Sequence, residues 1–232
     1  MKTKIITIEG IDGSGKTVQF NRLCENLRAL GYSVDTRSFP DYEAFFGRQV
    51  GRLLSGEEGV AATDVDQKSM ALWFALDRWE AFRGWQDGEY DFLIINRYVL
   101  SNAVYQSIRD RDLGKPDIID WVFDLEYGHF GLPRPALNLF FDVAAERAGI
   151  NVDSKGFRDY VGDGRDVYES SLGIQERARN MYVRAAERYD DISIINCMSG
   201  SRMRTPDSIA RSVLAIMRER GLITDKEQEK EL

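Results

Sequence analysis

The run from Glu9 to Thr17 constrains the fold of this chain more than any other feature. It reads Glu-Gly-Ile-Asp-Gly-Ser-Gly-Lys-Thr and contains the pattern G-x-x-x-x-G-K-[ST]. An apolar stretch at residues 5–8 precedes it, and an amphipathic stretch at residues 18–30 follows it. A phosphate-binding loop requires a strand before it and a helix after it. An accidental glycine-rich turn would need neither, so we interpret the run as a phosphate loop.

Each residue type in this loop suits the binding of phosphate. Glycines let the backbone curl so that successive N–H groups point inward at phosphate oxygens. Lys16 adds a positive charge, and the hydroxyl of Thr17 is a hard oxygen ligand suited to Mg²⁺. The following helix directs the positive end of its dipole at the same anion. The candidate residues for the phosphates of a nucleotide are Gly10, Asp12, Gly13, Ser14, Gly15, Lys16, Thr17 and Val18.

Length and composition are those of a globular protein with a substantial core. The chain has 232 residues, of which 43% are hydrophobic and 30% are charged, and no Pro/Gly/Ser-rich linker interrupts it. We therefore expect a single domain over residues 1–222 and a charged tail at residues 223–232. The 31 basic and 38 acidic residues give a net charge of −7, which argues against a general binder of nucleic acid or anionic membranes.

Cysteine and histidine usage excludes several kinds of site. Cys24 and Cys197 have neither metal-ligand spacing nor a disulfide-rich pattern, and we expect Cys24 to be a buried thiol on the first helix. His129 is the only histidine, which excludes histidine-based metal sites and Ser-His-Asp catalysis. The sequence shows no signal peptide and no apolar run near the length of a membrane span, so we expect a cytoplasmic protein.

Strand-like and helix-like stretches alternate along the chain, which predicts a parallel sheet with helices on both faces. Strands are expected at residues 5–8, 33–39, 91–95, 136–142 and 192–195. Helices are expected at residues 18–30, 46–54, 64–85, 118–126 and 206–220, and from near Ser101 and Tyr168. The predicted architecture is a P-loop NTPase-type three-layer α/β fold with a five-stranded parallel sheet. Its ligands would bind beyond the carboxyl ends of the strands.

The segment at residues 150–166 differs from its surroundings in composition. It contains three glycines, almost no aliphatic residues, and the cations Lys155, Arg158 and Arg165. A solvated surface loop is one interpretation of such a segment. Because a phosphate loop is present, we favour a lid that closes over phosphates and supplies cations.

Further motifs follow the phosphate loop in a fixed order. They are Phe39-Pro40-Asp41-Tyr42, then residues 72–78 (Leu-Trp-Phe-Ala-Leu-Asp-Arg), then residues 96–105 (Asn-Arg-Tyr-Val-Leu-Ser-Asn-Ala-Val-Tyr), and Asp166-Val167-Tyr168-Glu169 with Gln175. Over residues 5–217 the chain resembles thymidylate kinases, the P-loop nucleoside-monophosphate kinases that phosphorylate dTMP. The resemblance implies transfer of the γ-phosphoryl group of ATP to dTMP, for dTTP synthesis, with Mg²⁺ as cofactor and a homodimeric assembly.

The resemblance implies roles for residues around the base and sugar of dTMP. Phe74 would stack on the thymine ring, and Arg78, four residues later on the same helical face, would bond its O4 atom. From spacing alone, a core phenylalanine and a surface arginine would be the better interpretation. Asn102 matches an amide that contacts the base, Tyr105 a ring that disfavours a 2′-hydroxyl, and Tyr168 a side chain that closes the base pocket.

A second group of residues is implied around the phosphates. Arg97 directly follows a predicted buried strand and would clamp the monophosphate, which Tyr42 would also bond. Phe39 and Pro40 belong to the same substrate-binding motif as Tyr42. Asp12 matches a carboxylate near the sugar and the phosphates. Asp166 and Glu169 match acidic residues near sugar or metal, although both would also suit the capped start of a helix.

Phosphoryl transfer to a phosphate acceptor needs positioning and charge neutralisation more than a strong base. The candidate catalytic residues are Lys16, Arg97, Asp12, Arg158 and Arg165. Gly13 stands where some related loops carry an arginine, and the resemblance implies that a loop without this arginine is accompanied by catalytic arginines in the lid. This shifts weight to Lys155, Arg158 and Arg165.

Two positions depart from the family pattern. Asn96 stands where the family has an aspartate, so it offers Mg²⁺ a carbonyl oxygen without charge. The candidate metal-binding residues are Thr17, Asn96, Asp12 and Glu169. Residues 149–152 replace an arginine-rich start of the lid, with Arg147 just before them. These departures leave two alternatives open: a kinase for dUMP or a modified pyrimidine deoxynucleotide, and a non-catalytic nucleotide-binding homologue.

Overall fold

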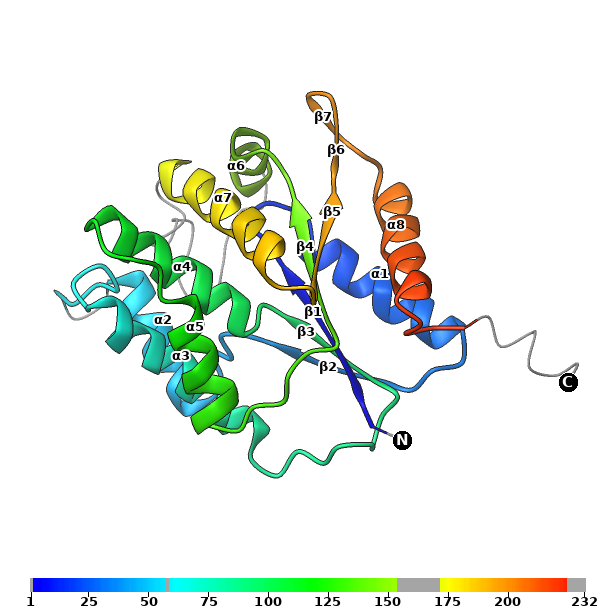
Figure 1. Ribbon diagram of the computed structural model, residues 1–232, viewed down its shortest axis with the longest axis horizontal. Helices are drawn as coiled ribbons and strands as arrows, with labels where there is room; N and C mark the ends of the chain where they lie inside the picture. The colour runs from blue at the N-terminus through cyan, green and yellow to red at the C-terminus, as the bar shows by residue number, and fades with distance from the viewer. Residues whose placement is uncertain (1, 57–58, 154–171, 225–232) are drawn as a thin grey trace, which may run out of the picture.

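The computed structural model describes residues 2–56, 59–153 and 172–224, which form a central sheet between two layers of helices (Figure 1). The strands are β1 (Lys4–Glu9), β2 (Val34–Ser38), β3 (Phe92–Asn96), β4 (Leu137–Asp142) and β5 (Ile192–Asn196). They lie in the order β2-β3-β1-β4-β5, and every neighbouring pair is parallel. The predicted three-layer α/β fold and its five-stranded parallel sheet are therefore confirmed.

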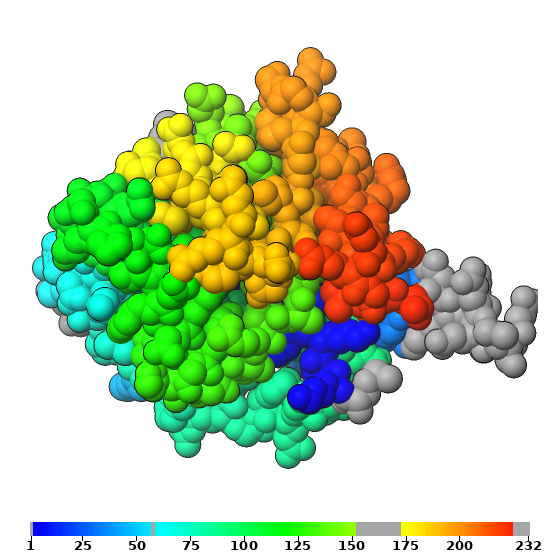
Figure 2. All heavy atoms as spheres, in the orientation of Figure 1, coloured from blue at the N-terminus to red at the C-terminus, as the bar shows by residue number. Residues whose placement is uncertain are grey.

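The two helical layers differ in size. Helices α1 (Lys16–Ala29) and α8 (Pro206–Glu219) cover one face of the sheet (Figure 1). The larger layer on the other face holds α2 (Phe45–Ser55), α3 (Gln67–Phe82), α4 (Val99–Asp112), α5 (Ile119–Phe123) and α7 (Leu172–Arg188). Figure 2 shows side chains filling the space between the helices, with the start of the chain, in dark blue, in the lower half of the view.

Strand β1 lies at the centre of the sheet because its side chains are apolar on both faces. Ile5, Ile6 and Ile8 are buried, and the hydroxyl of buried Thr7 donates to Asn138 Oδ1 at 2.7 Å. The register pairs Ile8 with Asn96 on β3 and Glu9 with Phe140 on β4. The residues that follow β1, β3 and β4 therefore leave the sheet at the same edge.

The structure differs from the sequence prediction at short or irregular elements. The stretch predicted as helix at residues 118–126 is α5 followed by a π-helical turn, η2 (Asp124–His129). A hairpin of β6 (Met198–Ser199) and β7 (Arg202–Met203) was not expected, because two-residue strands carry no readable periodicity. Cys24 is buried on α1, as predicted. Within the described residues no helix is long and apolar enough to span a bilayer.

The segment predicted as a lid begins inside a helix. Helix α6 (Ala145–Asp153) includes residues 150–153, which the sequence analysis assigned to a loop. Tertiary contacts favour the helix: Ala148 is buried, and Asn151 Nδ2 donates to the carbonyl oxygen of Gly13 at 2.8 Å. The remainder of the predicted lid, and the helix start expected near Tyr168, lie outside the described residues; α7 is described from Leu172.

The loop after β2 packs tightly between α2 and α3. The backbone N–H of Asp41 donates to both carboxylate oxygens of Asp77 on α3, at 3.2 and 3.3 Å. On α2, a β-carbon added to Gly47 would lie 1.8 Å from the carbonyl oxygen of Asp41 and 2.8 Å from Asp77 Oδ1. The missing side chain of Gly47 therefore allows the loop and the two helices to meet.

We expect Gly47→Ala to lower the free energy of unfolding by about 2 kcal/mol or more, because backbone atoms of Asp41 must move to admit the methyl group. Urea denaturation followed by circular dichroism measures this. Gly128→Ala is the matched control, since its β-carbon would meet only the side chain of exposed Asp124, at 2.9 Å. An equal loss in both variants would contradict the assigned contact.

Candidate nucleotide-binding site

The loop between β1 and α1 has the backbone conformation that its glycines predict. Gly10, Gly13 and Gly15 have φ angles of 143°, 77° and 84°, which residues with side chains rarely adopt. A β-carbon on Gly10 would also lie 3.0 Å from the carbonyl oxygen of Phe141 and from Ser14 Oγ. The curled loop therefore depends on glycine at these positions.

Lys16 begins α1 and folds back over the loop. Its Nζ donates to the carbonyl oxygens of Gly10 and Ile11 at 3.0 and 2.7 Å. Thr17 and Val18, the next two residues, are exposed at the amino end of the same helix. The side chain of Lys16 thus lies within the loop, while Thr17 faces solvent beside it.

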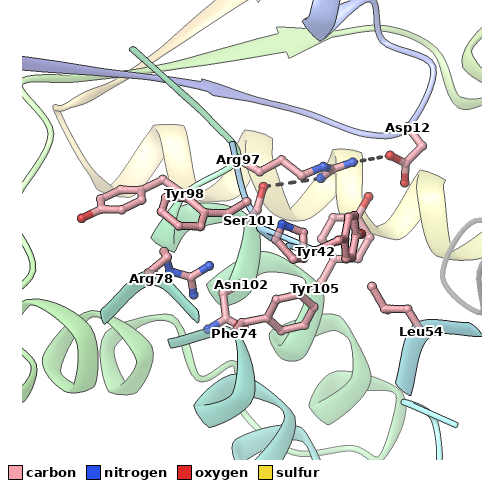
Figure 3. A pocket seen from close by; sticks show the side chains of 12 residues that line it. Asp12, Tyr42, Leu54, Phe74, Arg78, Arg97, Tyr98, Ser101, Asn102 and Tyr105 are labelled. Atoms are coloured by element: carbon pink, nitrogen blue, oxygen red, sulfur yellow. Dashed lines mark hydrogen bonds and ion pairs between the residues drawn. The ribbon is translucent and has the colours of Figure 1, made fainter. Parts of the chain in front are cut away.

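Arg97 follows β3 and reaches the phosphate loop from the side. Its φ angle is 60°, an uncommon left-handed value for a residue other than glycine. One guanidinium nitrogen pairs with Asp12 Oδ1, and Nη1 lies 3.5 Å from Ser101 Oγ (Figure 3). Burial is the largest single effect and lowers the pKa of Arg97, but the carboxylate of Asp12 and several weaker acidic neighbours together outweigh it and hold this pKa well above its ordinary value.

Glu9, the last residue of β1, is fully buried and joins three elements. Its Oε1 accepts from the backbone N–H of Tyr98 at 2.8 Å, and Oε2 accepts from the hydroxyls of Ser101 on α4 and Tyr182 on α7. Burial raises the pKa of Glu9, although its hydrogen bonds and the cations Arg97 and Lys16 act in the opposite direction. This carboxylate therefore fastens the start of the phosphate loop to the turn that carries Arg97.

A pocket lies beside the ion pair of Asp12 and Arg97 (Figure 3). Its lining includes every described residue that the resemblance predicted for dTMP: Asp12, Phe39, Pro40, Tyr42, Phe74, Arg78, Arg97, Asn102 and Tyr105. Leu54, Tyr98 and Ser101 also line it, and the sequence analysis missed them. Ser101 stands one helical turn before Tyr105, a spacing that indicates a shared face.

Arg78 and Asn102 lie on the other side of the pocket (Figure 3). Both donate to the carboxylate of Glu126. Arg78 Nε and Nη2 donate to Glu126 Oε2 and Oε1 at 2.5 and 2.6 Å. Asn102 Nδ2 donates to Glu126 Oε1 at 2.9 Å and to the carbonyl oxygen of Ala71 at 3.0 Å. Arg78 is buried, so the interpretation of this residue as a surface charge is wrong.

Part of the predicted site lies outside the described residues: Lys155, Arg158, Arg165, Asp166, Tyr168 and Glu169. Gln175, the last motif residue, is described and contacts the pocket lining. Its Oε1 accepts from the backbone N–H of Asp12 at 3.0 Å and from the hydroxyl of Tyr105 at 3.2 Å, and its Nε2 donates to Asp12 Oδ2 at 3.2 Å. Gln175 therefore braces Asp12 and Tyr105 from α7.

Similarity to known proteins agrees with this geometry. A family model described as thymidylate kinase matches residues 8–199. The chain belongs to the thymidylate kinase family. The thymidylate kinase of Mycobacterium tuberculosis (strains H37Rv and CDC 1551) is 36% identical over 185 residues, which span 78% of this chain and 85% of that protein.

More distant relatives carry the same name. A probable thymidylate kinase from Thermococcus onnurineus is 28% identical over 202 residues, covering 84% of this chain and 89% of that protein. The structure of thymidylate kinase from Candida albicans superposes with a TM-score of 0.74 at 22% identity, covering 97% of this chain and 96% of that one, and so shares the fold. As a member of the thymidylate kinase family, the chain is an ATP-dependent nucleoside-monophosphate kinase.

Two oxygens near the phosphate loop suit Mg²⁺. Asn96 Nδ2 donates to Ser38 Oγ at 2.9 Å, and Asn96 Oδ1 is buried without a hydrogen-bond partner among the described residues. Thr17 offers an exposed hydroxyl. Mg²⁺ takes hard oxygens and keeps several phosphate or water ligands, so this donor set fits it. In the described ranges no group of three or more His, Cys, Asp or Glu could hold a metal.

Asp77 holds the loop that carries Tyr42 and lies next to Arg78 in the sequence. It is fully buried and accepts from the backbone N–H of Asp41. Burial raises the pKa of Asp77 to about 6, despite the lowering effect of Arg78 and of that N–H group. The folded protein therefore binds this proton more tightly than the unfolded chain, and its stabilising effect is lost as pH rises from about 4 to about 6.

We expect Asp77→Asn to remove this dependence, because asparagine still accepts from Asp41 but does not titrate. The loss in free energy of unfolding between pH 5 and pH 7.5 should be smaller by about 1 kcal/mol than in the wild type. Urea denaturation at both pH values measures the difference. Glu89→Gln, on an exposed turn, is the control and should keep the wild-type pH dependence. A wild-type slope in Asp77→Asn would refute a raised pKa.

Proposed function

We propose that the pocket binds dTMP, with its phosphate at Asp12 and Arg97 and its base at Arg78, Asn102 and Phe74. One observation carries the proposal: every described residue predicted for dTMP lines a single pocket beside the phosphate loop. The close-up agrees with this division, since Asp12 and Arg97 lie along the upper side and Arg78, Asn102 and Phe74 lie below (Figure 3).

The polar groups of the pocket suit a thymine base. Glu126 engages Nε and Nη2 of Arg78, so Nη1 would donate to the O4 atom of thymine. Asn102 Oδ1 is buried without a partner among the described residues and would accept from the N3–H group. Phe74 would stack on the ring, and Tyr105 would lie beneath the sugar and disfavour a 2′-hydroxyl. Phe39, Pro40 and Tyr42 would complete the wall near the phosphate.

The proposed reaction joins a phosphate oxygen of dTMP to the γ-phosphorus of ATP, while the bond between the γ-phosphorus and the β–γ bridging oxygen breaks and leaves ADP. Lys16 and the backbone N–H groups of the loop would hold the ATP phosphates. Arg97 would neutralise the acceptor phosphate and orient the attacking oxygen. Thr17 and Asn96, with Asp12 nearby, would hold Mg²⁺, which would supply charge neutralisation for the phosphates of ATP.

Other parts of the proposal rest on residues outside the described ranges or on the family resemblance. Arg158 and Arg165, with Lys155, would bring lid cations to the transferred group, Asp166 and Glu169 would lie near sugar and metal, and Tyr168 would close the base pocket. We also propose a homodimer through α2 and α3. Exposed apolar side chains on these helices support it: Phe45 is 55% exposed, and Leu72 and Trp79 are each 38% exposed.

The decisive experiment measures ADP release with Mg-ATP and a panel of dTMP, dUMP, dCMP, dGMP, UMP and CMP. We expect turnover with dTMP to exceed turnover with each other nucleotide. A higher rate with another pyrimidine deoxynucleotide would favour the alternative of a kinase specific for that nucleotide. No turnover, from protein that still binds ATP, would favour the non-catalytic alternative.

In the same assay, Lys16→Ala should lower turnover of dTMP by at least about a hundredfold, because a buried cation at the transferred phosphates is lost. Binding of dTMP, measured by thermal shift, should persist because the pocket is unchanged. Lys68→Ala, an exposed lysine on α3, is the matched control and should retain the wild-type rate. An unchanged rate in Lys16→Ala would contradict the assignment of residues 9–17 as the phosphate loop.

Asn96→Asp tests the proposed metal ligands. The added carboxylate should lower the Mg²⁺ concentration that gives half-maximal rate, because a charged oxygen binds the cation more tightly than an amide oxygen. A titration of Mg²⁺ at saturating ATP and dTMP measures the shift. The control is the same substitution at an exposed position, Asn180→Asp on α7. Asn138 would not serve, because it is buried in the sheet. If both variants need the same Mg²⁺ concentration as the wild type for half-maximal rate, Asn96 does not contact the metal.

A further inference from the structure

We propose that Glu126 sets the base specificity of this kinase by fixing which hydrogen-bonding groups Arg78 and Asn102 present to the pocket. Glu126 is not among the pocket-lining residues and no motif marks it. The inference rests on the proposed binding of dTMP and adds a positioning residue behind the groups that would contact the base.

The backbone around Glu126 turns this one side chain inward. Glu126 belongs to the π-helical turn η2, in which the N–H of Phe130 donates to the carbonyl oxygen of Leu125, five residues earlier, at 2.9 Å. Asp124 and His129, at the ends of the turn, are each 72% exposed, whereas the Glu126 side chain is fully buried. Turns of this kind are rare and recur at functional sites.

Glu126 determines the orientation of the Asn102 amide. An amide nitrogen has two hydrogens, and those of Asn102 are used by Glu126 Oε1 and the carbonyl oxygen of Ala71. A reversed amide would bring Oδ1 against these two oxygens, with no hydrogen between them. Both hydrogens of Asn102 Nδ2 are therefore occupied by protein oxygens. Asn102 Oδ1 remains a buried acceptor without a partner in the described part of the chain.

Glu126 also fixes the plane of the Arg78 guanidinium. Two parallel hydrogen bonds, from Nε and Nη2, lock the planar group to the planar carboxylate. Nη1 takes no part in this pairing and carries two further hydrogens. The pair of side chains that lines the pocket thus offers one donor group, from Arg78, and one acceptor, from Asn102.

This pattern matches thymine and uracil and opposes cytosine. Thymine has an acceptor at O4 beside a donor at N3, whereas cytosine has a donor at its 4-amino group beside an acceptor at N3. With cytosine, the donor group of Arg78 would face the 4-amino donor and the acceptor of Asn102 would face the N3 acceptor. Buried polar groups would then lack hydrogen-bond partners. If Glu126 maintains the pattern, its loss should affect the choice between bases more than the chemical step.

Glu126→Gln tests this, because glutamine has the same shape but presents an NH₂ group to at least one of the three N–H groups that Glu126 accepts from. We expect kcat/KM for dTMP to fall about tenfold or more, mostly through KM, and the ratio of kcat/KM for dTMP over dCMP to narrow by a similar factor. KM for ATP should not change. Asp120→Asn is the control: on neighbouring α5 it removes a carboxylate that pairs with Arg188 outside the pocket, and it should leave the ratio unchanged.

A fall in activity toward dTMP and dCMP by the same factor would show that Glu126 serves the fold only, and would overturn the inference. Should Glu126→Gln fail to fold, Glu126→Asp keeps the charge but shortens the side chain by one methylene. The ratio of kcat/KM for dTMP over dCMP in that variant then tests the inference in the same way. A wild-type protein without preference for dTMP over dCMP would overturn the proposed function itself, and this inference with it.

Discussion

The site depends on the hydrogen bonds of one buried carboxylate, that of Glu9. It ends β1, and through Tyr98 N–H it holds the turn after β3 in which Arg97 adopts its left-handed backbone. The same carboxylate accepts from Ser101 on α4 and Tyr182 on α7. The parallel register of β1 and β3 brings the phosphate loop and Arg97 to one edge, and Glu9 fixes their relative position there. These contacts place Asp12 and Arg97 where their side chains pair.

The two arginines of the pocket are paired in ways that suit different tasks. Arg78 and Glu126 are almost fully buried, with side chains at most 2% exposed, so separating them would leave an uncompensated charge in the interior. Arg97 and Asp12 are each 19% exposed and lie at the phosphate loop. A phosphate group can therefore compete with Asp12 for Arg97 at lower cost. The first pair is suited to a fixed hydrogen-bonding pattern, and the second to an exchange of partners.

Sequence reasoning predicted the strands, most helices and the phosphate loop, because each depends on residues that are close together in the chain. It also grouped Phe39, Phe74, Arg97 and Tyr105, although only through the family resemblance. It missed Glu126, the partner of Arg78, which is 48 residues away, and it assigned no contact to the motif residue Gln175, which is 163 residues from Asp12. No local pattern encodes such contacts. Helix α6 was missed for a similar reason, since Asn151 is held by the phosphate loop and by Met203.

The central position of β1 has a consequence for synthesis of the chain. Its neighbours are β3 and β4, which begin at Phe92 and Leu137, so β1 leaves the ribosome well before either of its pairing strands. At 5–20 residues per second, this interval is on the order of ten seconds. During that time an isoleucine-rich edge lies exposed on the nascent chain. Glu9 lacks one of its hydrogen-bond donors for longer still, because Tyr182 is synthesised much later.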